Sequence, residues 1–267
     1  MYSVPSEACP EDKAICDLAN KGMDAQKLLR AAATFRRINL ERLQSGKGKP
    51  IVESGLFKGA LLYSGYIGSH LLPKIQGTYE KEVQDFLLKI SFMFDRFLDV
   101  GCAEGYYLSG VVAWKNIPCM GIDVDVRSGD AVDYLAADVR YRDLVSFSTN
   151  LADALPFMTG RLACLVDVDG GEIKIIEQLD SMFSNSSSLQ SVVLIVESSS
   201  AELGRENYPE IVSSLISRGW LFMSLLQQDP RERFVGSKSH MSFMDQFVDG
   251  WEGRPGAQSW VVAAKDF

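Results

Sequence analysis

The sequence predicts an α/β fold: a doubly wound, mostly parallel seven-stranded sheet with helices on both faces and an N-terminal helical extension. Short apolar runs that end in an acid or a glycine alternate with segments of helical periodicity, as parallel strands and their crossover helices do. The run 97–100 leads into a loop punctuated by Gly101 and Gly105, which is typical of the turn between a buried strand and a helix. Residues 191–197 form a nearly continuous apolar stretch, as expected of a central parallel strand.

Length and composition indicate a folded protein with an acidic balance. The chain has 267 residues, 46% of them hydrophobic, which suffices for one sizeable core. The formal net charge is −8 and the pI is near 4.9, so a broad electrostatic footprint for nucleic acid or an anionic membrane is not expected. Small molecules or sugars fit better as partners.

Several signals bear on the compartment. The five cysteines are scattered without a CxxC pair, which indicates reduced structural thiols. The first residues lack the basic start and apolar centre of a signal peptide, and no apolar run approaches the ~18 residues of a membrane span. We therefore expect a cytoplasmic protein.

We divide the chain into a helical extension with a linker, residues 1–50, and one domain, residues 51–267. Apolar residues recur at helical spacing over 25–43, which predicts an amphipathic helix. Such a helix could cover the core, line an acceptor cleft or contact a second copy in a homodimer. The glycine- and lysine-rich stretch 45–50 is typical of a linker. Further on, Thr78 is expected to cap a helix that carries the apolar positions of 83–90.

The loop after the first strand is the candidate cofactor site. Its candidate contacts are Asp99, Gly101, Cys102, Ala103, Glu104 and Gly105. Glu104 stands where the following helix begins, and a carboxylate there would repel a pyrophosphate but suit a cationic ligand. S-adenosylmethionine carries both an ammonium and a sulfonium. The loop therefore favours that cofactor over a dinucleotide, which also usually requires a third glycine.

The next two strands are expected to supply contacts to an adenosine. Residues 119–123 predict a second strand, and Asp123 at its end is the candidate acceptor for the ribose hydroxyls, with Asp125 as an alternative. Residues 134–139 predict a third, short strand. Asp138 would then accept from an adenine amino group, or serve only as a helix cap or loop acid.

Three acids follow the fourth predicted strand, residues 162–166. Asp167, Asp169 and Glu172 should face the same crevice as Asp99, because ligands gather at the carboxyl ends of parallel strands. They could act as a general base, orient the cofactor or bind a divalent metal. Two of these acids would seldom be enough for tight metal binding and no histidine is nearby, so no metal ligand is predicted.

The remaining elements complete the sheet. A helix is expected over 173–183, a strand over 191–197, a helix around 211–215 that ends at Gly219, and strands over 220–226 and 259–264. The intervening segment 227–258 could be a lid that holds His240 and Arg254 over the acceptor, or an insertion without that role.

With these residues together, the chain resembles the FkbM family of S-adenosylmethionine-dependent methyltransferases. Residues 98–107 are similar to the family's cofactor loop, 166–172 to its Asp-x-Glu-Gly-x-Glu signature, and 193–197 to its strand that ends in Glu. Gly77-Thr78-Tyr79-Glu80 also resembles a segment that precedes the loop in one branch of the family. The similarity spans roughly residues 55–264.

The resemblance implies a class I methyltransferase sheet with an antiparallel last hairpin and S-adenosylmethionine as methyl donor. The acceptor would usually be a hydroxyl oxygen of a sugar or natural product. Carried over, Asp99, Gly101 and Gly105 hold the methionine part of the cofactor, Asp123 holds the ribose, and Asp167 with Glu172 faces the reaction cleft. One position departs from the family, because Asp169 replaces the usual Glu.

The expected chemistry is in-line transfer from the sulfonium to the acceptor oxygen. Asp167 is the first candidate for the base that removes the proton, and His240 is its rival, because an ordinary Asp has a pKa of about 4 and is a weak base toward a hydroxyl. Three alternatives stay open. They are a non-catalytic nucleoside-binding module for regulation or assembly, a nicotinamide oxidoreductase, and an RNA ribose methyltransferase. The last is disfavoured by the charge and by the lack of a lysine at the strand ending in Glu197.

Overall fold

A computed structural model describes residues 49–65, 70–199, 206–228 and 258–267, together with isolated earlier residues. Its helices are α3 (Leu71–Gln76), α4 (Lys81–Lys89), α5 (Tyr106–Lys115), α6 (Arg127–Ala136), α7 (Glu172–Asn185) and α8 (Tyr208–Ser217), with 3-10 turns η1 (Ser91–Met93) and η2 (Leu151–Phe157). Its strands are β1 (Arg96–Val100), β2 (Cys119–Ile122), β3 (Val145–Ser148), β4 (Gly160–Val166), β5 (Leu189–Glu197), β6 (Leu221–Gln227) and β7 (Ser259–Asp266).

The strands form one seven-stranded sheet in the order β3-β2-β1-β4-β5-β7-β6. The first five strands are parallel, and β7 pairs antiparallel with both β5 and β6. This confirms the doubly wound, mostly parallel sheet and the antiparallel last hairpin. The chain runs outward from β1 to β3 and then returns to β4 on the other side of β1. The crevice between β1 and β4 is therefore the topological switch point, where open α/β sheets bind their ligands.

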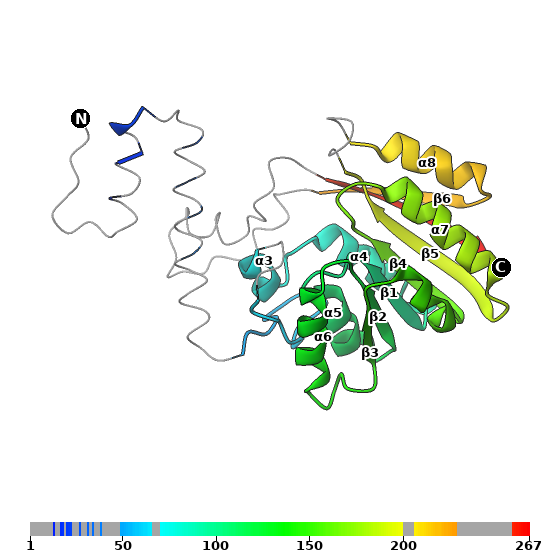
Figure 1. Cartoon of the computed structure of the whole chain (residues 1–267), viewed down its shortest axis with the longest axis horizontal. Helices are drawn as coiled ribbons and strands as arrows, with labels where there is room; N and C mark the ends of the chain where they lie inside the picture. The colour runs from blue at the N-terminus through cyan, green and yellow to red at the C-terminus, as the bar shows by residue number, and fades with distance from the viewer. Residues whose placement is uncertain are drawn as a thin grey trace.

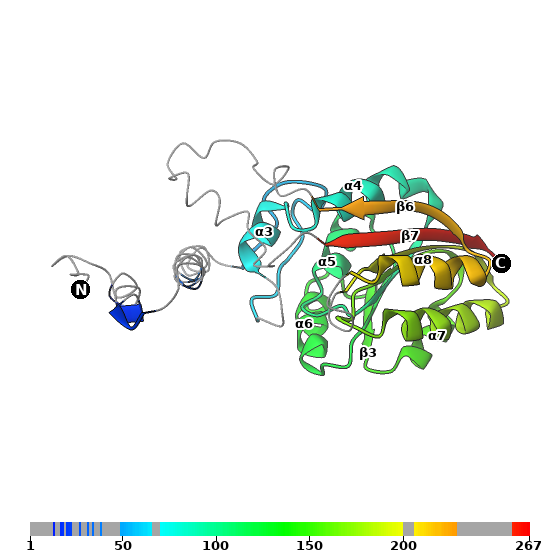
Figure 2. The same ribbon diagram turned by 90° about the horizontal axis from the view of Figure 1, so that it is seen from above.

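Helices cover both faces of this sheet (Figures 1 and 2), and each face has its own apolar core. One core packs α4, α5 and α6 against the sheet through residues such as Leu87, Val111 and Leu135. The other packs α7 and α8 through residues such as Leu179 and Leu215. The central strands β4 and β5 contribute to both cores, so both of their faces are apolar, as their continuous hydrophobic runs predict.

The third strand was predicted in the wrong place. Residues 127–136 form α6, because Ala131, Val132 and Leu135 recur at helical spacing and are all buried. The third strand is β3, whose residues are partly buried or exposed. It lies at the edge of the sheet and has no run of buried side chains, so apolar periodicity could not reveal it.

Two expected helix ends have different outcomes. Helix α4 is capped by Glu80 rather than Thr78, and Glu80 lies in the left-handed region with φ of 46°. The Thr78 hydroxyl bonds instead to the carbonyl of Pro73. Gly219 follows α8 with φ of 80°, which confirms it as the residue that ends the helix.

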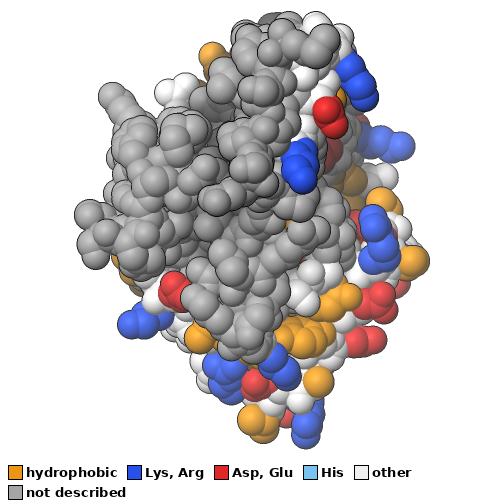
Figure 3. All heavy atoms as spheres, turned by 90° about the vertical axis from the view of Figure 1, so that its left-hand side faces the viewer, with side chains coloured by type: hydrophobic (Ala, Val, Ile, Leu, Met, Phe, Trp, Pro, Cys, Tyr) orange, Lys and Arg blue, Asp and Glu red, His pale blue; other side chains and the backbone are white. Residues whose placement is uncertain are grey.

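Of the N-terminal extension, Lys27, Ala31, Thr34 and Ile38 are helical, as the periodicity predicts. The division at residue 50 stays a prediction. None of the helices over the described residues is long and apolar enough to span a membrane. On the face shown in Figure 3, Lys and Arg side chains are interspersed with Asp and Glu among the described atoms.

Candidate functional site

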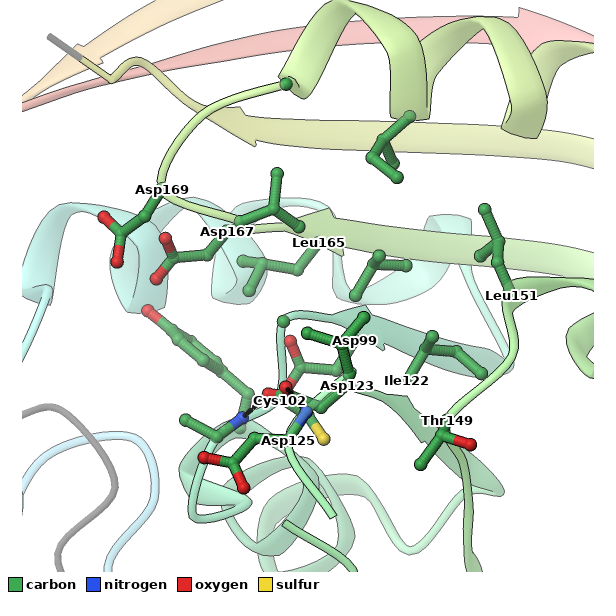
Figure 4. Close-up of a pocket in the computed structure, with 18 of the residues that line it drawn as sticks. Asp99, Cys102, Ile122, Asp123, Asp125, Thr149, Leu151, Leu165, Asp167 and Asp169 are labelled. Atoms are coloured by element: carbon green, nitrogen blue, oxygen red, sulfur yellow. Dashed lines mark hydrogen bonds between the residues drawn. The ribbon is translucent and has the colours of Figure 1, made fainter. Parts of the chain in front are cut away.

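A cavity of about 900 Å³ opens at the carboxyl ends of the parallel strands, at the switch point between β1 and β4. Its walls come from the loops after β1, β2, β3 and β4, and from α3 and the start of α4, α5 and α7. Figure 4 shows the acidic side chains of Asp99, Asp123 and Asp167 gathered at the ends of three neighbouring strands, with Thr149 and Leu151 farther along. The sequence places these elements here because each loop follows a buried strand of the same sheet.

The loop after β1 fits tightly against the loop after β4. Gly101 has φ of 93°, and a Cβ on it would lie 1.6 Å from the backbone oxygen of Asp167. The Asp167 amide in turn donates to the Val100 carbonyl at 2.8 Å. Gly101 is therefore required by the close approach of another strand's backbone and by its own left-handed conformation. Gly105, with φ of 74°, is the residue directly before α5 and does not line the cavity.

Asp123 holds the glycine loop in place from the end of β2. Its Oδ2 accepts from the Ala103 amide at 2.8 Å, and its Oδ1 accepts from the Asp125 amide at 2.8 Å. Ala103 is itself in the left-handed region with φ of 43°. Each carboxylate oxygen has a second lone pair, so Asp123 can still accept from the hydroxyls of a ligand. Asp125 lines the cavity too, but its carboxylate binds Arg127 and this holds the Asp125 pKa below its ordinary value.

Asp99 is a deeply buried acid of the cavity wall. Its side chain is 1% exposed, and its Oδ1 has no hydrogen-bond partner among the described residues. Burial raises the Asp99 pKa well above its ordinary value, and the charges of Asp167, Asp123 and Glu80 raise it further, while Lys74 lowers it. A buried carboxylate without a partner is costly. A cationic group in the cavity would remove that cost, so the donor set fits the positively charged S-adenosylmethionine.

Glu104 does not stand in the mouth of the site as the sequence suggested. It is absent from the cavity wall, and its carboxylate forms a buried ion pair with Lys74 of α3. No local pattern in the sequence indicates that Lys74, thirty positions earlier, is the partner of Glu104. The acids that face the cavity are instead those at the strand ends.

A cluster of three carboxylates lies beside Asp99. Ligand oxygens of Glu80, Asp167 and Glu197 all lie within 4.8 Å of one another. Glu80 and Glu197 are buried, and Glu80 Oε2 accepts from the Tyr107 hydroxyl at 2.6 Å. Burial is the main cause that raises the Tyr107 pKa well above its ordinary value, and the nearby Glu80 charge raises it further. Sequence reasoning noted Glu197 at a strand end but missed Glu80, whose only signal was the Gly-Thr-Tyr-Glu segment.

Glu172 is a structural member of the site in this fold, not part of the cavity wall. It is the first residue of α7 and is 1% exposed. Its Oε1 accepts from the Gly170 amide at 2.7 Å, and its Oε2 accepts from the Asn207 side chain at 2.9 Å. Asp169, two residues after Asp167, lines the cavity with φ of 50°, a conformation that Asp adopts more readily than Glu.

The other candidate residues divide as follows. Cys102 lines the cavity and is buried, and burial raises the pKa of its thiol, which disfavours the nucleophilic thiolate form. Asp138 follows α6, binds Arg140 and is absent from the wall, so the adenine contact predicted for it is not supported. The residues after the real third strand, Thr149 to Leu151, line the part of the cavity near β3 instead.

His240, the rival candidate for the base, lies outside the described residues, as does Arg254.

Comparison with family models finds no match, and no curated protein matches. Similar solved structures include a precorrin-6y C5,15-methyltransferase from Geobacter metallireducens, with TM-score 0.47 and 14% identity, covering 72% of this chain and 90% of that one. The O-methyltransferase TomG from Streptomyces achromogenes has TM-score 0.44 and 16% identity, covering 67% and 76%. Aeropyrum pernix fibrillarin, solved with S-adenosylmethionine, has TM-score 0.45 and 14% identity, covering 80% and 86%. Because these TM-scores are below 0.5 and the identities are 14–16%, the function of this chain has to be argued from its own site.

Proposed function

We propose that this chain is an S-adenosylmethionine-dependent methyltransferase that methylates a hydroxyl oxygen of a sugar or small natural-product acceptor. The observation that carries the proposal is the buried Asp99 carboxyl in a cavity at the switch point of the sheet, whose Oδ1 has no hydrogen-bond partner among the described residues. A dinucleotide pyrophosphate would bring more negative charge to this wall, whereas a cationic nucleoside offsets it. Membership of the FkbM family is part of the proposal, supported by the positions of the motif residues at the ends of β1 and β4.

The wall offers a place for each part of the cofactor. Asp123 would accept from the ribose hydroxyls, since it sits at the end of β2 and keeps lone pairs free for them. Thr149 to Leu151, after β3, would contact the adenine. Asp99 would lie toward the ammonium and sulfonium of the methionine part, where the carboxyl oxygen lacks a partner.

When bound, S-adenosylmethionine supplies an electrophilic methyl group. The chain's own contribution is to orient the acceptor hydroxyl in line with that group and to remove its proton, and alignment alone can be worth several kcal/mol, on the order of 7 at best. Asp167 is the proposed base because it lines the cavity at the end of β4. Carboxylate oxygens of Glu80 and Glu197 lie within 4.8 Å of an Asp167 oxygen, so three acids meet at this point of the cavity.

Calorimetric titration with S-adenosylmethionine and S-adenosylhomocysteine tests the cofactor. We expect micromolar binding to the wild type and at least about tenfold weaker binding to Asp99→Asn. The matched control is Asp95→Asn, an acid of the same chain segment that is 45% exposed and pairs with Arg161 at the other end of the sheet. A folded wild type that binds neither compound would refute the proposal, and binding of a nicotinamide dinucleotide would favour the oxidoreductase.

A second experiment separates the enzyme from a binding module. The protein with isotopically labelled S-adenosylmethionine is screened against sugar nucleotides, glycosides and hydroxylated small molecules, and products are detected by mass spectrometry. Asp167→Asn should lose about 10²-fold or more in turnover while still binding S-adenosylhomocysteine. Equal turnover in that variant would exclude Asp167 as the base. An acceptor methylated at nitrogen or carbon would overturn the assignment of the acceptor atom alone.

A further inference from the structure

Lys74 is the buried cation of the cavity wall. Of the charged residues that line the cavity within the described part of the chain, six are acidic and two are lysines, Lys74 and Lys174. Lys174 is exposed at the start of α7, whereas the Lys74 side chain is only 4% exposed. A buried ammonium loses most of its hydration, so its presence at a ligand cavity needs a compensating interaction.

Part of that compensation is visible in the protein. The Lys74 ammonium pairs with Glu104 Oε1, and Glu104 belongs to the glycine loop. Its Nζ also lies 4.6 Å from the ring centre of Tyr79 and 5.4 Å from that of Tyr106, distances that allow cation–π attraction. These contacts fix the direction of the side chain. The ammonium is thus held in one place at the cavity wall before any ligand arrives.

That place is the end of the cavity where the methionine part would lie. Tyr106 is the first residue of α5, directly after the glycine loop that follows β1. The ring centre of Tyr79 lies 5.2 Å from that of Tyr106, and both residues line the cavity. The charge of Lys74 also acts on Asp99, whose pKa it lowers. The adenosine contacts, by contrast, come from the ends of β2 and β3.

We propose that Lys74 binds the carboxylate of the methionine part of S-adenosylmethionine, so that the site recognises this end as a zwitterion. The inference rests on the proposed function. Asp99 and its acidic neighbours would face the ammonium, and Lys74 would face the carboxylate. An ammonium has three N–H donors, so it can keep its bond to Glu104 while it binds a ligand carboxylate. Lys74 is then a specificity residue of the donor site, which would reject cationic nucleosides that lack the carboxylate.

The test uses two ligands that differ only in this group. S-adenosylmethionine and its decarboxylated analogue are titrated into three proteins: the wild type, Glu104→Gln, and the double variant Lys74→Met/Glu104→Gln. The double variant removes the ion pair without leaving Glu104 buried and unpaired. Glu104→Gln alone is the matched control for the loss of the partner, and a circular-dichroism melt of each protein checks folding.

We expect the double variant to bind S-adenosylmethionine at least about tenfold more weakly than Glu104→Gln, while the affinity for the decarboxylated analogue stays within about twofold. Equal weakening for both ligands would show that Lys74 only supports the glycine loop, and no weakening would show that it has no role in binding; either result overturns the inference. A wild type that binds the decarboxylated analogue as tightly as S-adenosylmethionine would also overturn it. Failure of the folded wild type to bind either ligand would instead refute the proposed function, on which the inference rests.

Discussion

The side-chain amide of Asn207 donates a hydrogen bond of 2.9 Å to Glu172 Oε2, across 35 positions of the chain. The other oxygen of Glu172 accepts from the Gly170 amide, and Asn207 Oδ1 accepts from the Ser199 amide at 3.0 Å. The pair therefore joins the loop after β4 to the segment after β5. The first of these loops carries Asp167, and the second segment follows Glu197, so the hydrogen bond between Asn207 and Glu172 connects the supports of two members of the carboxylate cluster. Neither Asn207 nor Glu172 lines the cavity itself.

We expect Glu172→Ala to lower the free energy of unfolding by about 2–4 kcal/mol, because two hydrogen bonds to a buried carboxylate are lost. Urea unfolding measures this. The control is Glu177→Ala in the same helix, where the side chain is 51% exposed and pairs with Arg218, so the expected loss is about 0–1 kcal/mol. Unchanged stability of Glu172→Ala together with lost turnover would show instead that Glu172 acts on the reactants directly.

Two glycines with similar backbones separate conformational strain from steric conflict. Gly101→Ala places a Cβ against the Asp167 carbonyl and should destabilise by about 3 kcal/mol or more, with loss of cofactor binding. Gly171→Ala also has positive φ, 80°, but open space around the added Cβ, so it should cost only about 1–2 kcal/mol. Thermal melts and titration with S-adenosylhomocysteine compare the two. Equal losses would mean that the contact between the two loops contributes nothing.

The raised Asp99 pKa makes stability depend on pH. Between the ordinary value of 3.8 and the higher value in the fold, the folded state binds more protons than the unfolded chain, so Asp99 makes the free energy of unfolding fall as the pH rises. Asp99→Asn should therefore be more stable than the wild type at pH 8, and the difference should shrink toward pH 4. Urea unfolding at both pH values checks this, and a difference that grows toward acid would contradict it.

The same carboxyl should release a proton when a cation binds beside it. Titration of S-adenosylmethionine at several pH values, in buffers of different ionisation enthalpy, should show more proton release by the wild type than by Asp99→Asn. Identical release by the two proteins would place the cation away from Asp99.

Asp123 and Asp125 can be separated as ribose ligands. Asp123→Asn should weaken S-adenosylhomocysteine binding about tenfold or more, because an amide has one accepting oxygen where the carboxylate serves two backbone amides and the ribose. Asp125→Asn, whose carboxylate already binds Arg127, should change the affinity less than about threefold. The reverse order of effects would assign the ribose contact to Asp125.

The sequence predicts the position of a site residue well where that position follows directly from one strand of the sheet. Apolar runs predict β1, β2, β4 and β5, and parallel pairing of these strands then brings Asp99, Asp123 and Asp167 to one edge of the sheet, where the structure has them. The glycine loop was found by the same reasoning. These features depend on local pattern and on a general rule of sheet topology.

The misses share a physical origin in distant contacts. Glu104 looked like a free charge because its partner Lys74 comes from α3, and Glu80 joined the cluster from a segment with no strand of its own. Asp138 was expected after a third strand over 134–139, but residues 127–136 form helix α6. The real third strand, β3, is a short edge strand and buries too few side chains to show an apolar pattern. The roles of His240 and of 227–258 stay predictions.

The position of β7 governs when the sheet can be completed. Although β7 follows the other described strands in the chain, it lies between β5 and β6, each of which pairs with β7 and not with the other. Until residues 259–266 have been synthesised, one edge of β5 is unpaired, and β6 has no strand to pair with among those that the structure describes. A nascent chain at that stage would be prone to pair with other strands. The closing step joins residues far apart in sequence, so it is a candidate for the slow phase of folding.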